Sequence, residues 1–162
     1  MNEIFSAPLP ERPLLGLLTT GGTIAGAGDT PAQTIDYQAG VWDATDLLAA
    51  VPGLTAMARF RSEAVAAIDS KDITEALWRK LAARAQSLLD DPAVTGVLIT
   101  HGTDTLEETA YFLSLTLTGE KPVILTGAMR PATALSADGP ANLWNAARLA
   151  LSPKARGRGV LV

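Results

Sequence analysis

Leu14-Leu15-Gly16-Leu17-Leu18-Thr19-Thr20-Gly21-Gly22-Thr23-Ile24 is the stretch of sequence that decides the fold. Its opening is apolar, and a short apolar run bounded by Gly and hydroxyl residues is typical of a buried parallel strand. The same combination returns at residues 94–99, which are followed by Thr100-His101-Gly102-Thr103-Asp104-Thr105. In an open α/β sheet, ligands bind beyond the carboxyl ends of such strands. The two turns therefore predict a site that holds hydroxyl groups, glycine backbone and a carboxylate.

Strands and helices are expected to alternate along the rest of the chain. The hydrophobic pattern predicts strands at residues 14–18, 55–61, 64–68, 94–99 and 122–126, and one that opens at residue 159. It predicts helices at residues 43–50, 69–89, 105–117 and 138–151, the third of them opened by a capping box at residues 105–108. This alternation favours an α/β fold with a doubly wound, mainly parallel sheet and helices on both faces.

The chain is expected to form one domain. Residues 1–13 contain three prolines and predict an extended lead-in, so the domain would span residues 14–162. Residues 21–40 are poor in apolar side chains, and a loop of that length often serves as an active-site lid. The last three residues, Val160-Leu161-Val162, are the apolar opening of a strand, so we expect the chain to be cut short.

Composition narrows the function classes. Hydrophobic residues make up 48% of the chain and charged residues 19%, which is enough for a well-buried core. The net charge of −4 argues against nucleic-acid binding. The absence of cysteine and the single histidine exclude disulfides, a cysteine nucleophile and a His-rich metal site, and we expect no metal and no cofactor. Because the sequence shows neither a secretory signal nor a membrane span, we expect a cytoplasmic protein without membrane contact.

Two nucleotide-binding motifs and the usual motif around a catalytic serine are not present. The glycine-rich stretch at residues 19–29 lacks both the G-x-G-x-x-G spacing and the Gly-Lys-Ser/Thr ending of the nucleotide-binding loops. A Ser-His-Asp triad of Ser70, His101 and Asp104 is conceivable, but Ser70 does not sit in G-x-S-x-G. His101 directly follows a buried strand, so a structural hydrogen bond is the preferred interpretation.

Threonine hydroxyls are the remaining candidates for chemistry. Thr23 follows two glycines, where backbone can approach a ligand closely, and a threonine becomes a nucleophile when a neighbour takes its proton. Asp104 offers a carboxylate that could hold an ammonium group. The alternative interpretation is that Thr20, Thr23 and Thr105 only satisfy backbone groups of turns and caps. The recurrence of such a turn at two strand ends favours the active-site interpretation.

Five motifs in this order resemble the bacterial-type L-asparaginases and glutaminase-asparaginases. The first two are residues 20–24 and residues 101–105, about 80 residues apart. The other three are Glu107-Glu108-Thr109-Ala110-Tyr111-Phe112-Leu113, Gly127-Ala128-Met129-Arg130-Pro131 and Ser136-Ala137-Asp138-Gly139-Pro140. The resemblance runs from about residue 14 to residue 162 and implies the flavodoxin-like, amino-terminal catalytic domain of that family. The smaller carboxyl-terminal domain would be absent.

The resemblance implies an amidohydrolase that needs no cofactor. It would convert L-asparagine to L-aspartate and ammonia, with L-glutamine as a second candidate substrate. Thr23 would be the nucleophile, and Tyr37 would be the lid tyrosine that hydrogen-bonds it. Thr103 would be the second catalytic threonine. Three further residues would contact the substrate: Asp104 its ammonium group, Ser70 its α-carboxylate, and Ala128 the region of its amide through backbone.

Two departures from the family pattern bear on function. Lys71 stands where periplasmic members often carry glutamine, and a cation would have to turn away or contact a carboxylate. The family's catalytic lysine would fall beyond Val162, so we expect the chain to be inactive alone, whereas the full-length enzyme would be a homo-oligomer. Two alternatives stay open: an asparaginase-like amidotransferase subunit, and a non-catalytic fragment that binds an amino acid.

Overall fold

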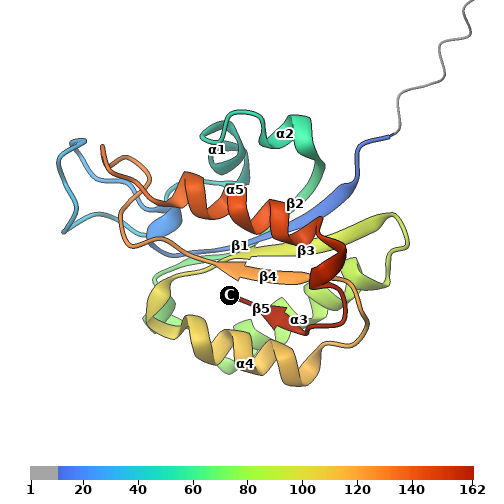
Figure 1. Cartoon of the computed structure of the whole chain (residues 1–162). Helices are drawn as coiled ribbons and strands as arrows, with labels where there is room; N and C mark the ends of the chain where they lie inside the picture. The colour runs from blue at the N-terminus through green and yellow to red at the C-terminus, as the bar shows by residue number, and fades with distance from the viewer. Residues whose placement is uncertain (1–10) are drawn as a thin grey trace, which may run out of the picture.

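The computed structural model describes residues 11–162, which form a three-layer α/β domain (Figure 1). Within these residues one five-stranded sheet has the order β2-β1-β3-β4-β5, and every neighbouring pair is parallel. The prediction of a doubly wound parallel sheet is confirmed, in the strand order of flavodoxin-like proteins. The strands are Leu14–Gly21 (β1), Arg59–Ile68 (β2), Val94–Thr100 (β3), Val123–Thr126 (β4) and Val160–Leu161 (β5).

Helices cover both faces of the sheet, as predicted. Successive side chains of a strand point to opposite faces, so Leu15 and Leu17 of β1 enter one hydrophobic core and Leu18 enters the other. Figure 1 shows α1, α2 and α5 on the first face and α3 and α4 on the second. The helices are Ala44–Ala49 (α1), Leu54–Met57 (α2), Glu75–Asp90 (α3), Leu106–Thr116 (α4) and Gly139–Ala150 (α5).

The prediction of two strands between residues 55 and 68 was wrong. Residues 54–57 form the short helix α2, which follows Gly53 in the left-handed conformation, and β2 is one continuous strand from Arg59 to Ile68. β2 lies at the edge of the sheet, where most of its side chains are exposed or half-buried. An edge strand tolerates polar residues such as Ser62 and Glu63, so these residues do not interrupt it.

Two helix starts also differ from the prediction. Residues 70–72 form a 3₁₀ turn, and α3 begins at Glu75, where the side chain of Thr74 accepts a hydrogen bond from the backbone N–H of Leu77. The capping box predicted at residues 105–108 is not formed. Thr105 instead donates its hydroxyl proton to the carbonyl of Ser70 at 3.0 Å, because the end of β2 lies beside it.

The sheet has its topological switch point between β1 and β3. The chain passes from β1 to β2 on one side and then returns to place β3 on the other side of β1. Ligands of such sheets bind in the crevice at the carboxyl ends of these two strands. The threonine-bearing turns that follow β1 and β3 therefore lie where the fold offers a binding site.

The remaining segments are peripheral to this crevice. Of the predicted lead-in, residues 1–10 lie outside the described residues, and the carbonyl of Pro13 accepts a hydrogen bond from the N–H of Arg59 at 2.8 Å beside the start of β2.

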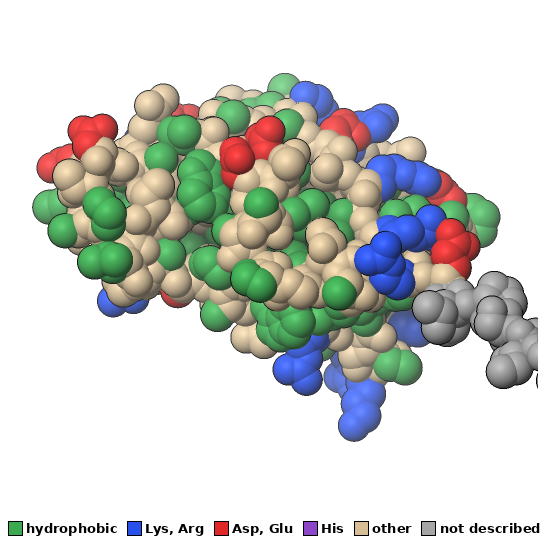
Figure 2. Space-filling view, turned by 90° about the horizontal axis from the view of Figure 1, so that it is seen from above, with side chains coloured by type: hydrophobic (Ala, Val, Ile, Leu, Met, Phe, Trp, Pro, Cys, Tyr) green, Lys and Arg blue, Asp and Glu red, His purple; other side chains and the backbone are tan. Residues whose placement is uncertain are grey.

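Figure 2 looks down on the face covered by α1, α2 and α5, where hydrophobic and uncharged atoms predominate. Within residues 11–162, no helix has the length and apolar character needed to cross a membrane.

Candidate active site

The turns after β1 and β3 touch each other backbone to backbone. Gly22 has φ of 75°, and a Cβ placed on it would lie 2.4 Å from the Cα of Gly102. The N–H of Gly22 donates to the carbonyl of Ile68 at 2.8 Å, which joins the same turn to the end of β2. Only glycine satisfies both the left-handed conformation and the close approach. Gly22 thus fixes the position of Thr23, the next residue, relative to the turn after β3.

Thr23 contacts the tyrosine that was predicted to face it. The two hydroxyl oxygens, Thr23 Oγ1 and Tyr37 Oη, lie 2.5 Å apart, and both residues are half-buried. Residues 26–40, called the lid below, turn back on themselves so that Ala27 and Gln38 exchange two backbone hydrogen bonds of 2.9 and 3.0 Å. This pairing returns the chain toward β1 and brings Tyr37 over Thr23.

Ser70 and Asp104 meet at the ends of β2 and β3. Ser70 is buried, and its Oγ accepts a hydrogen bond from the backbone N–H of Asp104 at 3.1 Å. The Asp104 residue itself is exposed, so its carboxylate is accessible to a ligand. The Ser70 hydroxyl is thereby held against the backbone of the residue that carries the exposed carboxylate, and a hydroxyl and a carboxylate together suit a ligand that carries both a negative and a positive group.

The turn that carries Thr103 after β3 lies beside Gly127, the residue before Ala128 in the loop after β4. Thr103 opens a 3₁₀ turn after β3, and a Cβ placed on Gly127 would lie 3.2 Å from its Cγ2. Ala128 follows Gly127 in the loop after β4 and is only 2% exposed. The six predicted site residues thus come from the carboxyl ends of β1, β2, β3 and β4 and from the lid. The roles given to them stay predictions.

His101 belongs to a buried hydrogen-bond network beneath these turns. Its Nδ1 lies 2.6 Å from Thr20 Oγ1, and its Nε2 lies 2.9 Å from Thr109 Oγ1. Thr20 donates to the carbonyl of Thr100, and Trp78 Nε1 donates to Thr109 Oγ1. The proton positions follow: Nδ1–H donates to Thr20, and the Thr109 hydroxyl donates to Nε2.

Burial beneath the turns determines the charge of His101. Burial lowers the pKa of His101 to about 4, so the ring is neutral at pH 7. Among the described residues its ring nitrogens contact the hydroxyl groups of Thr20, Thr105 and Thr109, and no hydrogen bond joins the ring to Ser70 or Asp104. This geometry opposes the Ser-His-Asp triad and agrees with a structural histidine.

Lys71 contacts a carboxylate, one of the two alternatives that the sequence left open. Its Nζ forms an ion pair with Asp69 at the surface. The hydrogen bond that Lys71 donates to Asp69 raises the pKa of Lys71, and the charges of Asp72 and Asp104 act in the same direction. Lys71 is therefore a cation close to the carboxylate that was predicted to bind the substrate ammonium.

Among residues 11–162, no three His, Asp or Glu side chains are grouped as metal ligands.

Asp138 is a site-shaping residue for which the sequence analysis predicted no side-chain role. Its two carboxylate oxygens accept hydrogen bonds from the backbone N–H groups of Met129 and Arg130, each at 2.9 Å. Burial alone would raise the pKa of Asp138, but these donors outweigh it, and the pKa lies below its ordinary value. The sequence shows Asp138 only as the start of a helix, and nothing in it indicates that the carboxylate binds the preceding loop and not the backbone of that helix. Asp138 holds the loop that carries Ala128.

Fold and site together define an α/β protein in which, at the carboxyl ends of parallel strands, a threonine hydroxyl contacts a tyrosine and the neighbouring turn carries an exposed carboxylate. The description "Asparaginase, N-terminal" belongs to the family model that matches residues 15–162. The chain belongs to this family, of which it represents the amino-terminal domain.

Relatives support the same assignment. The chain is 48% identical to L-asparaginase 2 of Bacillus subtilis over 164 residues, which cover 99% of this chain and 44% of that protein. It is 51% identical to the glutaminase-asparaginase of Pseudomonas fluorescens biotype A over 146 residues, which cover 90% of this chain and 40% of that protein. The crystal structure of a probable cytoplasmic L-asparaginase from Campylobacter jejuni superimposes with a TM-score of 0.89 at 47% identity, covering 92% of this chain and 45% of that one. The chain therefore spans less than half the length of these relatives.

Proposed function

We propose that this chain supplies the nucleophile and most substrate contacts of an amidohydrolase that acts on L-asparagine. The observation that carries the proposal is the 2.5 Å contact between Thr23 Oγ1 and Tyr37 Oη at the switch point of the sheet. A threonine hydroxyl needs a neighbour that receives its proton before it can attack a carbonyl carbon. Tyr37 is the neighbour in contact with it, which supports the assignment of Thr23 as the nucleophile.

The reaction would proceed in two steps. Thr23 Oγ1 forms a bond to the side-chain amide carbon, the carbon–nitrogen bond breaks, and ammonia leaves with the proton taken from the hydroxyl. Water then adds to the resulting ester, the bond to Thr23 breaks, and aspartate is released. Thr103 would steady or activate that water, and its position beside Gly127 and Ala128 supports this role.

Substrate recognition would rest on the pair at the ends of β2 and β3. Asp104 would bind the ammonium group, and Ser70 would face the α-carboxylate. Their contact at 3.1 Å supports a site that reads both ends of an amino acid. L-glutamine is a possible second substrate, since some relatives are named glutaminase-asparaginases.

The complete protein is proposed to be a homo-oligomer, and its location is proposed to be the cytoplasm. One structural relative is titled cytoplasmic, whereas a relative from Haemophilus influenzae is named periplasmic. Cell fractionation tests the location, and sedimentation of the complete protein tests its assembly.

Ammonia release tests the proposed activity. The chain is joined to the carboxyl-terminal part of the Bacillus subtilis relative, so that the chimaera has the length of a complete member. Thr23→Ala should then reduce kcat for asparagine by about 10³-fold or more, because removal of a nucleophile abolishes the covalent route. Thr55→Ala, at an exposed position on α2, is the matched control and should leave kcat unchanged. A Thr23→Ala chimaera with the parent's kcat would contradict the proposal.

A further inference from the structure

The loop between β4 and α5 is held at its root by two polar side chains of α5's first turns. Asp138 accepts hydrogen bonds from the N–H groups of Met129 and Arg130. Asn142 Nδ2 donates to the carbonyl of Gly127 at 3.0 Å and to Asp138 Oδ2 at 3.1 Å. Three of the four loop residues 127–130, all except Ala128, are thereby hydrogen-bonded to one helix end.

The next part of this loop, residues 131–135, lies along the lid and is called the strap. The N–H of Ala132 donates to the carbonyl of Gly26 at 2.8 Å, and the N–H of Leu135 donates to the carbonyl of Pro31 at 2.9 Å. Between them, the N–H of Gly28 donates to Thr133 Oγ1 at 2.9 Å. Thr133 Oγ1 also donates to the carbonyl of Gly28 at 3.5 Å, so the strap forms four hydrogen bonds to a segment about 105 residues away in sequence.

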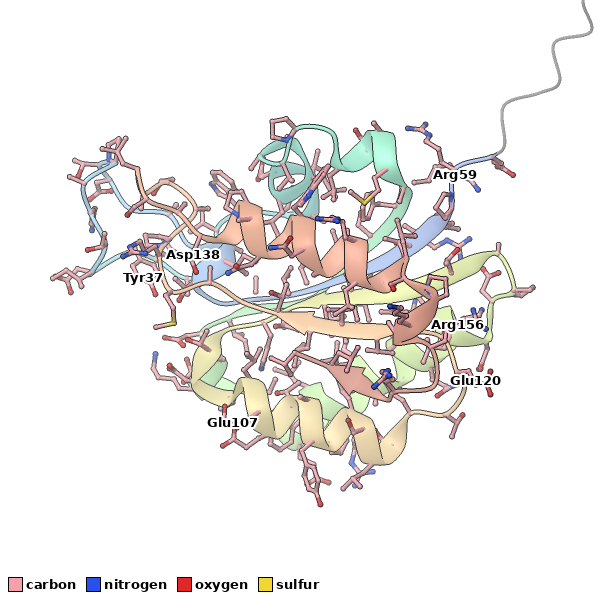
Figure 3. The ribbon with its side chains drawn as sticks, in the orientation of Figure 1. Tyr37, Arg59, Glu107, Glu120, Asp138 and Arg156 are labelled. Carbon is pink, nitrogen blue, oxygen red and sulfur yellow. The ribbon has the colours of Figure 1, made fainter. Side chains whose placement is uncertain are left out.

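Apart from the strap, the lid is held by backbone hydrogen bonds at its two ends, residues 26 and 40, and by the contact of Tyr37 with Thr23. Its apolar side chain at Ile35 is 72% exposed, so it packs into neither core. A segment with few buried apolar contacts opens at low free-energy cost unless hydrogen bonds restrain it. Figure 3 shows Tyr37 and Asp138 at the same end of the molecule, one from the lid and one from the start of α5.

We propose that Asp138 is a positioning residue for Tyr37: it fixes the strap, and the strap holds the lid where Tyr37 Oη meets Thr23 Oγ1. Asp138 bonds to the backbone of Met129 and Arg130, so its effect on Tyr37 passes through the chain between them. The functional value of this contact rests on the function proposed above, whereas the contact itself is measurable without turnover.

The test uses Asp138→Asn in the 162-residue protein. The variant keeps the shape of the side chain but presents an amide NH₂ to one of the two N–H donors, which cannot then be satisfied. The chain has two tyrosines, so 3-fluorotyrosine labelling gives two ¹⁹F resonances, and Tyr111→Phe assigns them. We expect the Tyr37 resonance to shift, and the amides of Ala27 and Gln38 to exchange with solvent about 10-fold faster.

Asp43→Asn is the matched control. Asp43 also accepts two backbone N–H bonds at a helix start, from Thr45 at 2.7 Å and Asp46 at 2.9 Å, but it lies on α1. This variant should leave the Tyr37 resonance unchanged, which separates a specific effect from general loosening of a helix cap.

A second variant, Thr133→Val, removes the strap hydroxyl that contacts Gly28 without altering α5, and it decides the matter if Asp138→Asn does not fold. It should shift the Tyr37 resonance in the same direction. Faster exchange confined to Met129 and Arg130, with Tyr37, Ala27 and Gln38 unchanged in the folded variants, would overturn the proposal. Failure of Thr23→Ala to reduce ammonia release would instead overturn the proposed function and leave this result standing.

Discussion

At the scale of single residues, Gly26 determines how closely Tyr37 can approach Thr23. A Cβ placed on Gly26 would lie 2.8 Å from Tyr37 Cδ2, although the φ of −81° at this position suits alanine. The main conflict is therefore with the tyrosine ring, and the backbone carbonyl of Thr23, at 3.0 Å from this Cβ, adds a smaller one. The site predicted from the sequence depends on a glycine that the motif comparison did not single out.

Gly26→Ala should displace Tyr37 and reduce kcat/KM of the chimaera for asparagine by about 10-fold or more, since a small misplacement of a catalytic group is costly. In a Tyr37→Ala background the same change should have little further effect, because the ring it displaces is gone. Steady-state kinetics of the four proteins form a double-mutant cycle. Additive losses would show that Gly26 acts on something other than Tyr37.

The pKa of His101 makes stability depend on pH. The ordinary pKa of 6.5 applies to the unfolded chain, and the folded value is about 4, so the unfolded state binds the proton more readily. The contribution of neutral His101 to the free energy of unfolding is fully present above pH 6.5. It decreases as the pH falls from 6.5 to about 4, and below pH 4 this group causes no further loss. Between pH 7 and pH 5 the loss should be about 2 kcal/mol.

Urea unfolding at pH 7, 6 and 5 measures this loss. His101 is the only histidine of the chain, so His101→Gln should remove most of the pH dependence in this range while costing stability at pH 7. An unchanged slope in the variant would mean that carboxylates cause the dependence and that His101 is not neutral in the fold.

The residue scale also marks the limit of sequence reasoning. Thr23 and Asp104 were identifiable because each follows a strand end in a recognisable motif. The partners of His101 were not, since Thr109 on α4, which itself accepts a hydrogen bond from Trp78 on α3, reaches it only after both helices pack on the sheet. The role of Asp138 was not identifiable either, since its carboxylate accepts hydrogen bonds from backbone N–H groups of the loop before α5 and not from those of α5.

At the scale of elements, periodicity predicted the buried strands and the helices but not their boundaries. β1 and β3 were predicted because they are apolar throughout, as central strands are. The edge strand β2 alternates weakly and was divided in two. The start of α3 was placed at Asp69 because several residues there favour a cap, whereas the cap is Thr74.

Thr74→Ala tests that boundary. Loss of the N-cap hydroxyl should destabilise the domain by about 1 kcal/mol, as measured by chemical denaturation. The Tyr37 ¹⁹F resonance should not move, because α3 does not contact the lid. Asp69→Ala should cost less, since Asp69 makes only an exposed ion pair with Lys71. A larger loss for Asp69→Ala would indicate that the helix begins at Asp69, as the sequence predicted.

At the scale of the whole molecule, the chain carries the candidate nucleophile but spans less than half the length of its relatives. The resemblance places a catalytic lysine beyond residue 162, and catalytic groups that act as a unit are strongly non-additive. The 162-residue protein should therefore release ammonia from asparagine at least about 10²-fold more slowly than the chimaera. Equal kcat/KM for the two would show that the added part is dispensable.

The central claim, that Thr23 is the nucleophile, is tested most directly by locating the covalent intermediate. The chimaera carrying Thr103→Val, which should slow hydrolysis of the ester, is mixed with asparagine, quenched in acid, digested and analysed by mass spectrometry. We predict an aspartyl group on the peptide that contains Thr23, and its absence when Thr23→Ala is added. An aspartyl group on the peptide that contains Ser70, or one that persists with Thr23→Ala, would contradict the account.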